Sequence, residues 1–489
     1  MEDWTVHLPP GMSPGELDLL AERSLVGSWT ARWREDPARR QLQDVDGTWL
    51  TSAELEERTR LAAQRLVGAG LGRGDRFALS GSPSAALVVA YIAALRAGLV
   101  VVPINSAYPE PEVRRIVADA RPAFAAVEGE RLGDWIASGG TRVVGLDLDL
   151  PDAPDAEIDT VDARSPALLI YTSGTTGRPK GAPLSHGNLL ASARSVGMAW
   201  RWKASDELLL SLPLFHVHGL GVGLNGSLCA GAAVVLMARF DPAAVAARCC
   251  EGISLFFGVP TMYQRLATSG AARRMRSLRL LVSGSAPLPA ALAEEIAAQS
   301  GQTPLERYGM TETGMLTSNP YDGPRKPGTV GLPLPGAELR LSDSGGVEVR
   351  GPNVIAGYFE RPDADAEAFT EDGWFRTGDV GELDEDGYLR LVGRSKELII
   401  SGGYNVYPRE VEEVLATHPS VREVAVVGRP SERWGEEVTA VVVVAAPIED
   451  EELRAYAAQR LAQYKVPKRI EFADELPRNA MGKIVRAEL

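Results

Sequence analysis

A run of hydroxyl, glycine and lysine side chains follows a short apolar segment in the first half of the chain. The apolar segment is residues 167–171, and the run that follows contains Thr172, Ser173, Gly174, Thr175, Thr176, Gly177 and Lys180. Glycines let backbone amides approach phosphate groups, hydroxyls donate hydrogen bonds to them, and lysine adds positive charge. The spacing differs from the GxxxxGK[ST] pattern of P-loop kinases and GTPases. The run therefore predicts a phosphate-binding loop of another kind, and an ordinary flexible loop is the alternative.

Lysine is rare in this chain, so its positions are informative. The sequence has 44 Arg but only seven Lys. Three of the seven, Lys180, Lys396 and Lys483, lie in segments that also carry glycines, hydroxyls or other charged groups. A compact, strongly hydrated ammonium group is chemically distinct from a planar guanidinium group. Its use at these three positions indicates a functional requirement for lysine.

The loop and several later segments resemble, in the same order, the acyl-adenylate-forming (ANL) superfamily. That superfamily includes acyl- and aryl-CoA ligases, peptide-synthetase adenylation domains and beetle luciferases. The matching segments are 171–181, 212–216, 308–312, 377–379, 393–394 and 482–483, so the resemblance covers nearly the whole chain. It implies an AMP-forming acid–CoA ligase that uses ATP, coenzyme A and Mg²⁺.

The residue types in these segments suit a nucleotide. Tyr308 offers a face for stacking adenine, Thr311 can donate to the α-phosphate, and Glu312 offers hard oxygen to Mg²⁺. Asp379 can accept from both ribose hydroxyls, with Arg394 nearby as a donor. Taken singly, these could be a core tyrosine, a turn aspartate and a surface arginine. The ATP and AMP site implied by the resemblance comprises Thr172, Ser173, Gly174, Thr175, Thr176, Lys180, Tyr308, Gly309, Thr311, Asp379 and Arg394.

The resemblance also implies catalytic and moving parts. Lys483 matches the catalytic lysine, which would bridge the substrate carboxylate and the α-phosphate, and His216, Thr311 and Glu312 complete the catalytic set. Lys396 matches a hinge at which the small domain changes orientation between the two half-reactions. Gly402, Gly403 and Tyr404 resemble the wall of the CoA tunnel. The ordinary alternatives are a solvated Lys483 and a satisfied His216 at a strand end.

Two arginines and a serine suggest which acid is activated. Arg265, Ser285 and Arg307 lie in segments that resemble malonyl-CoA synthetases, where matching residues hold the distal carboxylate of malonate or methylmalonate. An arginine fork suits bidentate carboxylate binding. Alternatively, Arg265 lies on a helix surface and Arg307 pairs with Glu306 or another acid.

Two further residues belong to the predicted acyl pocket, Val217 and Met310. Val217 stands where some relatives carry Thr, which leaves the α-substituent of the acid open. One methyl group typically changes discrimination by only ~1–3 kcal/mol. Use of both malonate and methylmalonate is therefore expected.

Four other functions compete with this interpretation. Within the superfamily, a monocarboxylate or aryl acid–CoA ligase is the nearest alternative. A peptide-synthetase adenylation domain is disfavoured because the pocket segments show no acidic residue suited to an amino group, and a luciferase-type oxygenase shares the fold. An inactive nucleotide-binding scaffold would be expected to lack Glu312, Lys483 or the loop threonines, which are all present.

The numbers of charged residues and cysteines limit the possible partners and cellular location of the protein. With 51 Lys plus Arg against 65 Asp plus Glu, the net charge is −14, which argues against a general nucleic-acid or anionic-membrane surface. The three cysteines show no zinc spacing, and the N-terminal segment lacks the features of a signal peptide. We therefore expect a cytoplasmic monomer or weak homo-oligomer that acts on small molecules.

The pattern of elements predicts the architecture. Thr51 and Glu54 form a capping box for a helix that ends near Gly68, followed by strands at 76–80 and 99–103 with a helix through Ala94 between them. This alternation continues to about residue 320 and predicts mostly parallel, helix-covered sheets. Later segments predict a hairpin at 374–392, then helix, two strands (421–427 and 438–445) and a helix at 450–462.

The predicted fold class is therefore α/β. The expected division is an N-terminal AMP- and acyl-binding domain, 1–393, and a small mobile α+β C-terminal domain, 394–489, with the boundary at 393–396. The resemblance adds a small distorted β-barrel to the larger domain and identifies the whole as the adenylate-forming enzyme fold.

Overall fold

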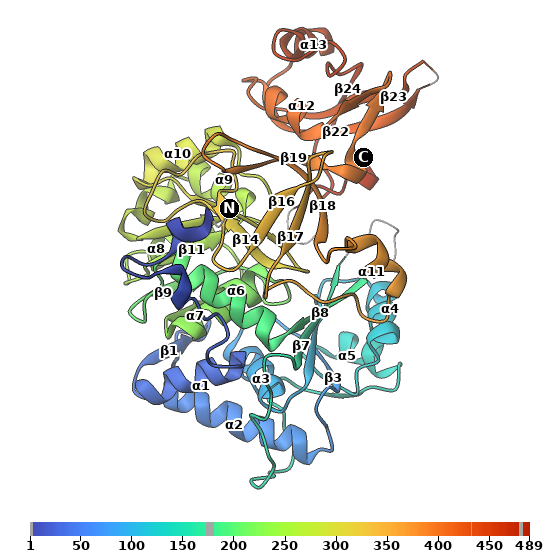
Figure 1. The fold of residues 1–489 in the computed structure, drawn as a ribbon. Helices are drawn as coiled ribbons and strands as arrows, with labels where there is room; N and C mark the ends of the chain where they lie inside the picture. Colours follow the sequence, from blue (N-terminus) through green and yellow to red (C-terminus); the bar gives the residue numbers. More distant parts are fainter. Residues whose placement is uncertain (1–2, 173–179, 432, 479–482) are drawn as a thin grey trace. The chain divides into compact units, whose positions relative to one another are not determined.

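The computed structural model describes residues 3–172, 180–431, 433–478 and 483–489. Contacts divide the chain into two compact units (Figure 1). The first comprises Met1–Leu288, Leu292–Glu338 and Val349–Phe375, and the second comprises Pro289–Ala291, Leu339–Glu348 and Arg376–Leu489. No helix among the described residues is long and apolar enough to cross a membrane.

The first unit contains a six-stranded, mostly parallel sheet. Its order is β6 (Arg142–Val144), β5 (Phe124–Val127), β3 (Arg76–Ser80), β4 (Val100–Pro103), β7 (Pro166–Thr172) and β8 (Lys180–Ser185). Only β8 runs antiparallel to its neighbour. Helices α4 (Glu110–Ala120) and α5 (Glu130–Ala137) cover one face, because their buried side chains share a cluster with alternate residues of these strands.

A nine-stranded sheet forms the rest of the first unit's framework. Its order is β15 (Leu332–Pro333), β14 (Gly314–Ser318), β13 (Leu305–Met310), β12 (Leu280–Ser283), β11 (Leu255–Gly258), β9 (Glu207–Leu210), β10 (Ala233–Leu236), β1 (Arg40–Gln43) and β2 (Trp49–Thr51). The six strands from β13 to β1 are parallel. Helices α8 (Pro242–Arg248), α9 (Pro260–Thr268) and α10 (Ala290–Ser300) pack on one face.

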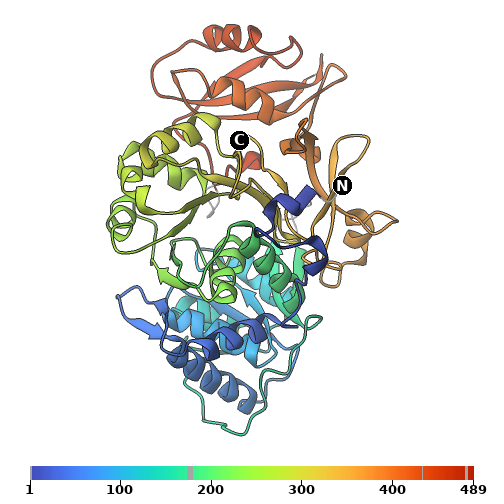
Figure 2. The same cartoon turned by 60° about the vertical axis from the view of Figure 1, so that its left-hand side comes forward.

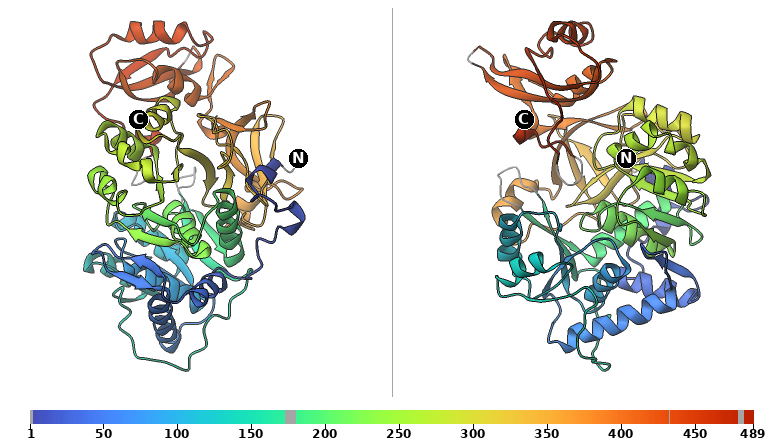
Figure 3. Two further views of the ribbon diagram at one scale, coloured as in Figure 1. Left: turned by 90° about the vertical axis from the view of Figure 1, so that its left-hand side faces the viewer. Right: turned by 180° about the vertical axis from the view of Figure 1, so that it is seen from behind.

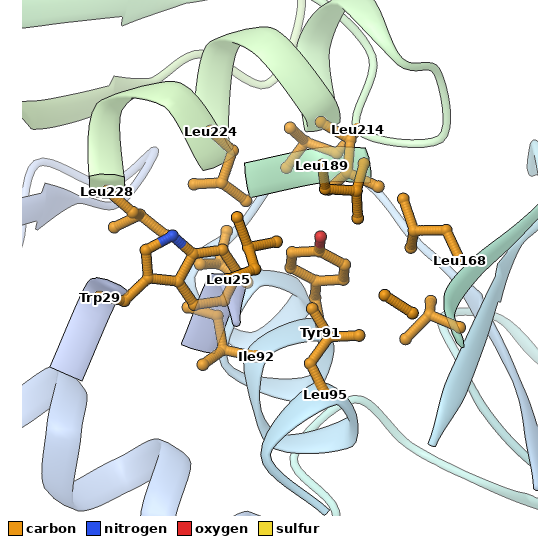
Figure 4. Packing of buried hydrophobic residues seen from close by; sticks show 14 of the residues in the cluster. Leu25, Trp29, Tyr91, Ile92, Leu95, Leu168, Leu189, Leu214, Leu224 and Leu228 are labelled. Carbon is orange, nitrogen blue, oxygen red and sulfur yellow. The ribbon is translucent and has the colours of Figure 1, made fainter. Parts of the chain in front are cut away.

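The two sheets share one apolar core. Side chains from the other face of each sheet join a single cluster with helices α1 (Leu25–Glu35), α2 (Ser52–Gly68), α3 (Ala85–Arg96), α6 (His186–Ala199) and α7 (Asn225–Ala230). Figure 4 shows Trp29 and Tyr91 surrounded by leucines within this cluster, and their ring centroids lie 6.2 Å apart. Helix α2 is the long blue helix in the right-hand view of Figure 3 and packs against α3. This core fixes the edges of both sheets.

The second unit carries two smaller sheets. One has the order β16 (Glu338–Leu341), β17 (Gly346–Arg350), β18 (Phe375–Leu383) and β19 (Leu389–Arg394). The other contains β20 (Ile399–Ser401), β21 (Tyr404–Val406), β22 (Val421–Ser431), β23 (Gly435–Val444) and β24 (Arg469–Phe472). Helices α12 (Pro408–Leu415) and α13 (Asp450–Ala458) pack on one face of the latter (orange to red in Figure 2).

The predicted fold class and most predicted elements are confirmed. The capping box at Thr51 and Glu54 starts α2, which ends at Gly68, and the predicted hairpin is the antiparallel pair β18–β19. The final helix ends at Ala458 instead of residue 462, and β22 extends to Ser431 because its whole length pairs with β23. The contact-defined second unit begins earlier than residue 394, because β18 and β19 belong to one sheet with β16 and β17. A hinge at 393–396 stays a prediction.

Replacing Leu55 by Ala should destabilise the first unit, because this side chain is 0% exposed in the shared core. Removing a buried leucine typically costs about 2–5 kcal/mol. Leu61 lies on the same helix but is 36% exposed, so Leu61→Ala is the matched control. Thermal unfolding should show a clearly lower midpoint for Leu55→Ala alone, and equal midpoints for the two variants would contradict the described packing.

Candidate active site

The predicted site residues of the first unit gather at the carboxyl ends of neighbouring strands. His216 and His218 follow β9, Ser285 follows β12, and Thr311 and Glu312 follow β13. The carboxyl ends of parallel strands meet at one edge of a sheet, where α/β proteins usually bind ligands. The topology therefore brings together segments that lie almost 100 residues apart in the sequence.

Glu312 is held in a fixed position by two hydroxyl groups. Thr172 Oγ1 and Tyr358 Oη donate hydrogen bonds to Glu312 Oε1, at 3.3 and 3.1 Å. The Lys180 ammonium lies 5.2 Å from the centroid of the Tyr358 ring. The carboxylate is only 5% exposed. The lysine predicted to bind phosphate and the predicted metal ligand therefore both contact Tyr358. This tyrosine could not be identified from the sequence, because nothing in its local pattern distinguishes it.

Only the two ends of the predicted phosphate loop belong to the described residues. Thr172 at the end of β7 pairs with Lys180 at the start of β8. Ser173, Gly174, Thr175 and Thr176 lie outside the described residues. The antiparallel pairing brings the two ends of the loop together beside Glu312.

The segment predicted to contact adenine is the end of β13. Tyr308 and Thr311 are buried, whereas Gly309 and Met310 are partly exposed. A register shift between Tyr308 and Gly309 interrupts the pairing with β14. Such irregularities are common next to active sites, where they re-aim side chains.

Arg307 is a buried cation that has no counter-ion among the described residues. It is 3% exposed, and its Nε and Nη2 atoms have no hydrogen-bond partner among the described residues. Burial lowers its pKa to about 9, so it remains positively charged at neutral pH. No ion pair between Arg307 and Glu306 is seen among the described residues, and the Glu306 carboxylate accepts a hydrogen bond from the Leu288 amide at 3.1 Å. A Cβ on Gly284 would lie 2.3 Å from Arg307 Cζ, so only glycine leaves room for this guanidinium group.

Two neutral histidines and a serine stand near this cation. His218 Nδ1 lies 3.1 Å from Ser285 Oγ. Desolvation and the Arg307 charge hold the pKa of His216 at about 4 and that of His218 well below its usual value. The neighbouring Val217 is buried. Because both imidazoles are neutral, they offer hydrogen-bonding groups and no charge to compete with Arg307.

Arg265 is not seen to join this group in the described structure, and its predicted place in the acyl pocket stays a prediction. Its side chain is exposed on α9, with the guanidinium carbon 4.9 Å from the centroid of the Phe240 ring. Phe240 packs with the cluster on the α9 face of the nine-stranded sheet, whereas Val217 and Phe257 belong to the opposite face. The partly buried Met262 contacts that opposite cluster instead. The direction of the Arg265 side chain depends on where helix α9 begins, at Pro260. The spacing of residues in the sequence does not determine that direction.

The second unit brings together its own predicted residues. Arg394 Nε donates to Asp379 Oδ1 at 2.9 Å. Lys483 is exposed, but desolvation by the surrounding protein lowers the pKa of its ammonium group, helped by the charges of Arg394 and Arg486 and opposed by Glu397 and Asp379. Lysine, two arginines and two carboxylates therefore form one charged group.

The predicted hinge and tunnel residues lie at exposed positions. Lys396 is in a short 3-10 helix, Ser395–Glu397, directly before β20. Gly402 and Gly403 have φ of +60° and +82° in the turn between β20 and β21. Tyr404 is exposed and stacks on Tyr464, with ring centroids 4.6 Å apart. Left-handed backbone conformations favour glycine, which accounts for this pair.

The acidic residues fit magnesium held mainly by a substrate. No group of three or more His, Cys, Asp or Glu within the described ranges could hold a metal ion by itself. Magnesium is usually bound by one or two carboxylates together with substrate phosphates and water. The oriented Glu312 carboxylate beside Lys180 suits that arrangement.

Comparison with known proteins agrees with this geometry. The family described as AMP-binding enzyme matches residues 29–359, and its C-terminal domain matches residues 410–483. A feruloyl-CoA synthase of Amycolatopsis sp is 39% identical over 95% of this chain and 98% of its own length. A malonate–CoA ligase of Arabidopsis thaliana is 36% identical over 87% of this chain and 79% of its own.

A solved structure also shares the whole fold. ATP-bound MatB from Rhodopseudomonas palustris superimposes with a TM-score of 0.88, at 38% identity, over 94% of this chain and 97% of its own. These matches confirm the predicted adenylate-forming fold and the predicted class of acid–CoA ligase. The chain therefore belongs to the family of AMP-binding enzymes.

Proposed function

We propose that this enzyme joins a small dicarboxylic acid, malonate or methylmalonate, to coenzyme A through an acyl-adenylate. The single observation that carries the proposal is the buried Arg307 guanidinium group, which has no counter-ion in the described part of the chain. An unpaired cation in a protein interior is costly unless another charge compensates it. A second carboxylate on the substrate would supply that charge, with the Ser285 hydroxyl as an additional donor.

The first half-reaction is an in-line displacement that needs no protein nucleophile. A carboxylate oxygen of the acid attacks the α-phosphorus of ATP, the bond to the bridging oxygen breaks, and pyrophosphate leaves. Catalysis then depends on orientation and on neutralising charge. Lys180 and the loop hydroxyls would hold the leaving group, while Lys483 would neutralise the attacking carboxylate and the α-phosphate. Glu312 would hold Mg²⁺, which lowers the negative charge of the phosphates.

The second half-reaction transfers the acyl group. The CoA sulfur attacks the acyl carbon, the bond to AMP breaks, and the thiol proton is lost to solvent. Lys396 as the hinge and Gly402, Gly403 and Tyr404 as the CoA tunnel remain part of this proposal. So do ribose binding by Asp379 and Arg394 and adenine stacking on Tyr308.

An aryl acid is the second candidate substrate. The partly buried Met262 contributes an apolar side chain to the cluster nearest the site, whereas the exposed Arg265 guanidinium group lies over Phe240. A related protein is a feruloyl-CoA synthase, whose acid has one carboxylate. Recognition by Arg307 alone would leave room for a longer, flatter acid that offers it a neutral oxygen.

A panel of acids distinguishes the two candidates. Formation of AMP and pyrophosphate from ATP should be measured with malonate, methylmalonate, acetate and ferulate, with and without CoA. Malonate or methylmalonate should give the highest kcat/KM. Ferulate in first place would overturn the diacid assignment, and formation of ADP in place of AMP would overturn the mechanism.

Replacing Arg307 by Met should raise KM for the diacid by about 10- to 100-fold, because a charge-assisted hydrogen bond is lost. The KM for ATP should change little. Arg265→Met is the matched control and should behave like the wild type, since Arg265 is exposed and lies over Phe240. If both variants keep wild-type kinetics with malonate, the guanidinium group of Arg307 does not bind a second carboxylate.

Lys483 should set the alkaline limit of adenylation. Its pKa lies below the usual 10.5, chiefly because of desolvation, and only the cationic form can neutralise the phosphate. The value of kcat/KM for ATP–pyrophosphate exchange should therefore fall as pH rises through a midpoint below 10.5. Lys483→Arg should move that fall to higher pH at a lower overall rate. A wild-type midpoint at or above the usual value would argue against the role of Lys483.

A further inference from the structure

His218 is a buried side chain to which the proposed mechanism gives no role. It begins the helical turn His218–Leu224, and its Nε2 atom has no partner among the described residues. A Cβ on the next residue, Gly219, would lie 2.3 Å from the Pro213 carbonyl oxygen, so the chain reverses tightly at this point. The turn aims the imidazole inward and leaves it little freedom.

Aromatic packing fixes the plane of the His218 ring. The ring lies 18° from parallel to that of Phe257, with centroids 6.5 Å apart. Phe257 in turn makes T-shaped contacts with Trp200 and Trp202, each with 5.4 Å between ring centroids. The only hydrogen-bonding contact of the imidazole among the described residues is Nδ1 to Ser285 Oγ at 3.1 Å. His218 is thus a rigid partner for one hydroxyl group.

Ser285 occupies an unusual backbone conformation. Its φ is +69°, in the left-handed region that a serine seldom adopts. Such strained residues persist only when the surrounding structure holds them, and they cluster at ligand sites. Here the strained Ser285 directly follows Gly284, the residue that packs against the Arg307 guanidinium group.

We infer that His218 is a positioning residue that makes the Ser285 hydroxyl a donor toward the substrate. A neutral imidazole has one donor and one acceptor nitrogen. When Nδ1 carries the proton, it donates to Ser285 Oγ, and the serine hydrogen is then left to donate to an oxygen of the bound acid. This inference rests on the proposed function. It adds that the Ser285 hydroxyl, oriented by His218, favours acids whose second carboxylate can accept a hydrogen bond.

The first test compares His218→Asn with His218→Gln. The Asn amide can occupy the place of Nδ1 and still donate to Ser285, whereas the longer Gln carries its amide past that place. With the acid that the panel ranks first, His218→Asn should keep a near wild-type KM. His218→Gln should raise the KM for the acid about three- to tenfold, the range of one lost neutral hydrogen bond, with kcat and the KM for ATP little changed.

A double-mutant cycle tests the connection to Ser285. Ser285→Ala should raise the KM for the acid to a similar extent, and His218→Gln should add nothing in the Ser285→Ala background. If the increases in KM caused by His218→Gln and Ser285→Ala multiply in the double variant, the inference is overturned. Equal increases in KM for His218→Asn and His218→Gln would overturn it as well. If the panel shows no acid that depends on Arg307, the proposed function fails, but the coupling between 218 and 285 is still measured with the preferred acid.

Discussion

The constraint on which this site depends is a buried guanidinium cation with no carboxylate paired to it in the part of the chain that the structure describes. Removing Arg307 from water is unfavourable, and the protein offers it no compensating charge among the described residues. The neighbouring residues leave this charge uncompensated, because His216 and His218 are neutral. Gly284, which packs against the guanidinium group, has no side chain. Such an arrangement is stable only because the large core around it contributes far more than the one charge costs.

The position of that cation follows from sheet topology. Strands β9, β11, β12 and β13 are neighbours and run parallel, so the segments after them meet at one edge. Alternation along each strand then decides which face a side chain occupies. Arg307 shares its face with Leu305, which belongs to the core between the two sheets. The order and direction of the strands therefore determine where the site lies, and individual side chains determine its properties.

Sequence reasoning predicted the framework well and the pocket partly. The capping box at Thr51, the buried strand at 76–80 and the hairpin after Trp374 depend on local patterns, and local patterns are visible in a sequence. Arg265 shows the limit, since its distance in sequence from Ser285 says nothing about the face of the sheet it reaches. Tyr358 shows another limit, because its hydrogen bond to Glu312 spans 46 residues and follows from tertiary packing alone.

A chain of ion pairs in the second unit links the tail to the segment before β20. Arg486, three residues after Lys483, contacts Glu397 at 3.2 Å and Glu412 at 2.7 Å. Glu397 directly follows Lys396, and Glu412 belongs to α12. These two ion pairs attach residues 483–489 to two segments of the second unit. If Lys396 is the hinge, Lys483 would move together with Glu397 and helix α12, because Arg486 ties the end of the chain to both.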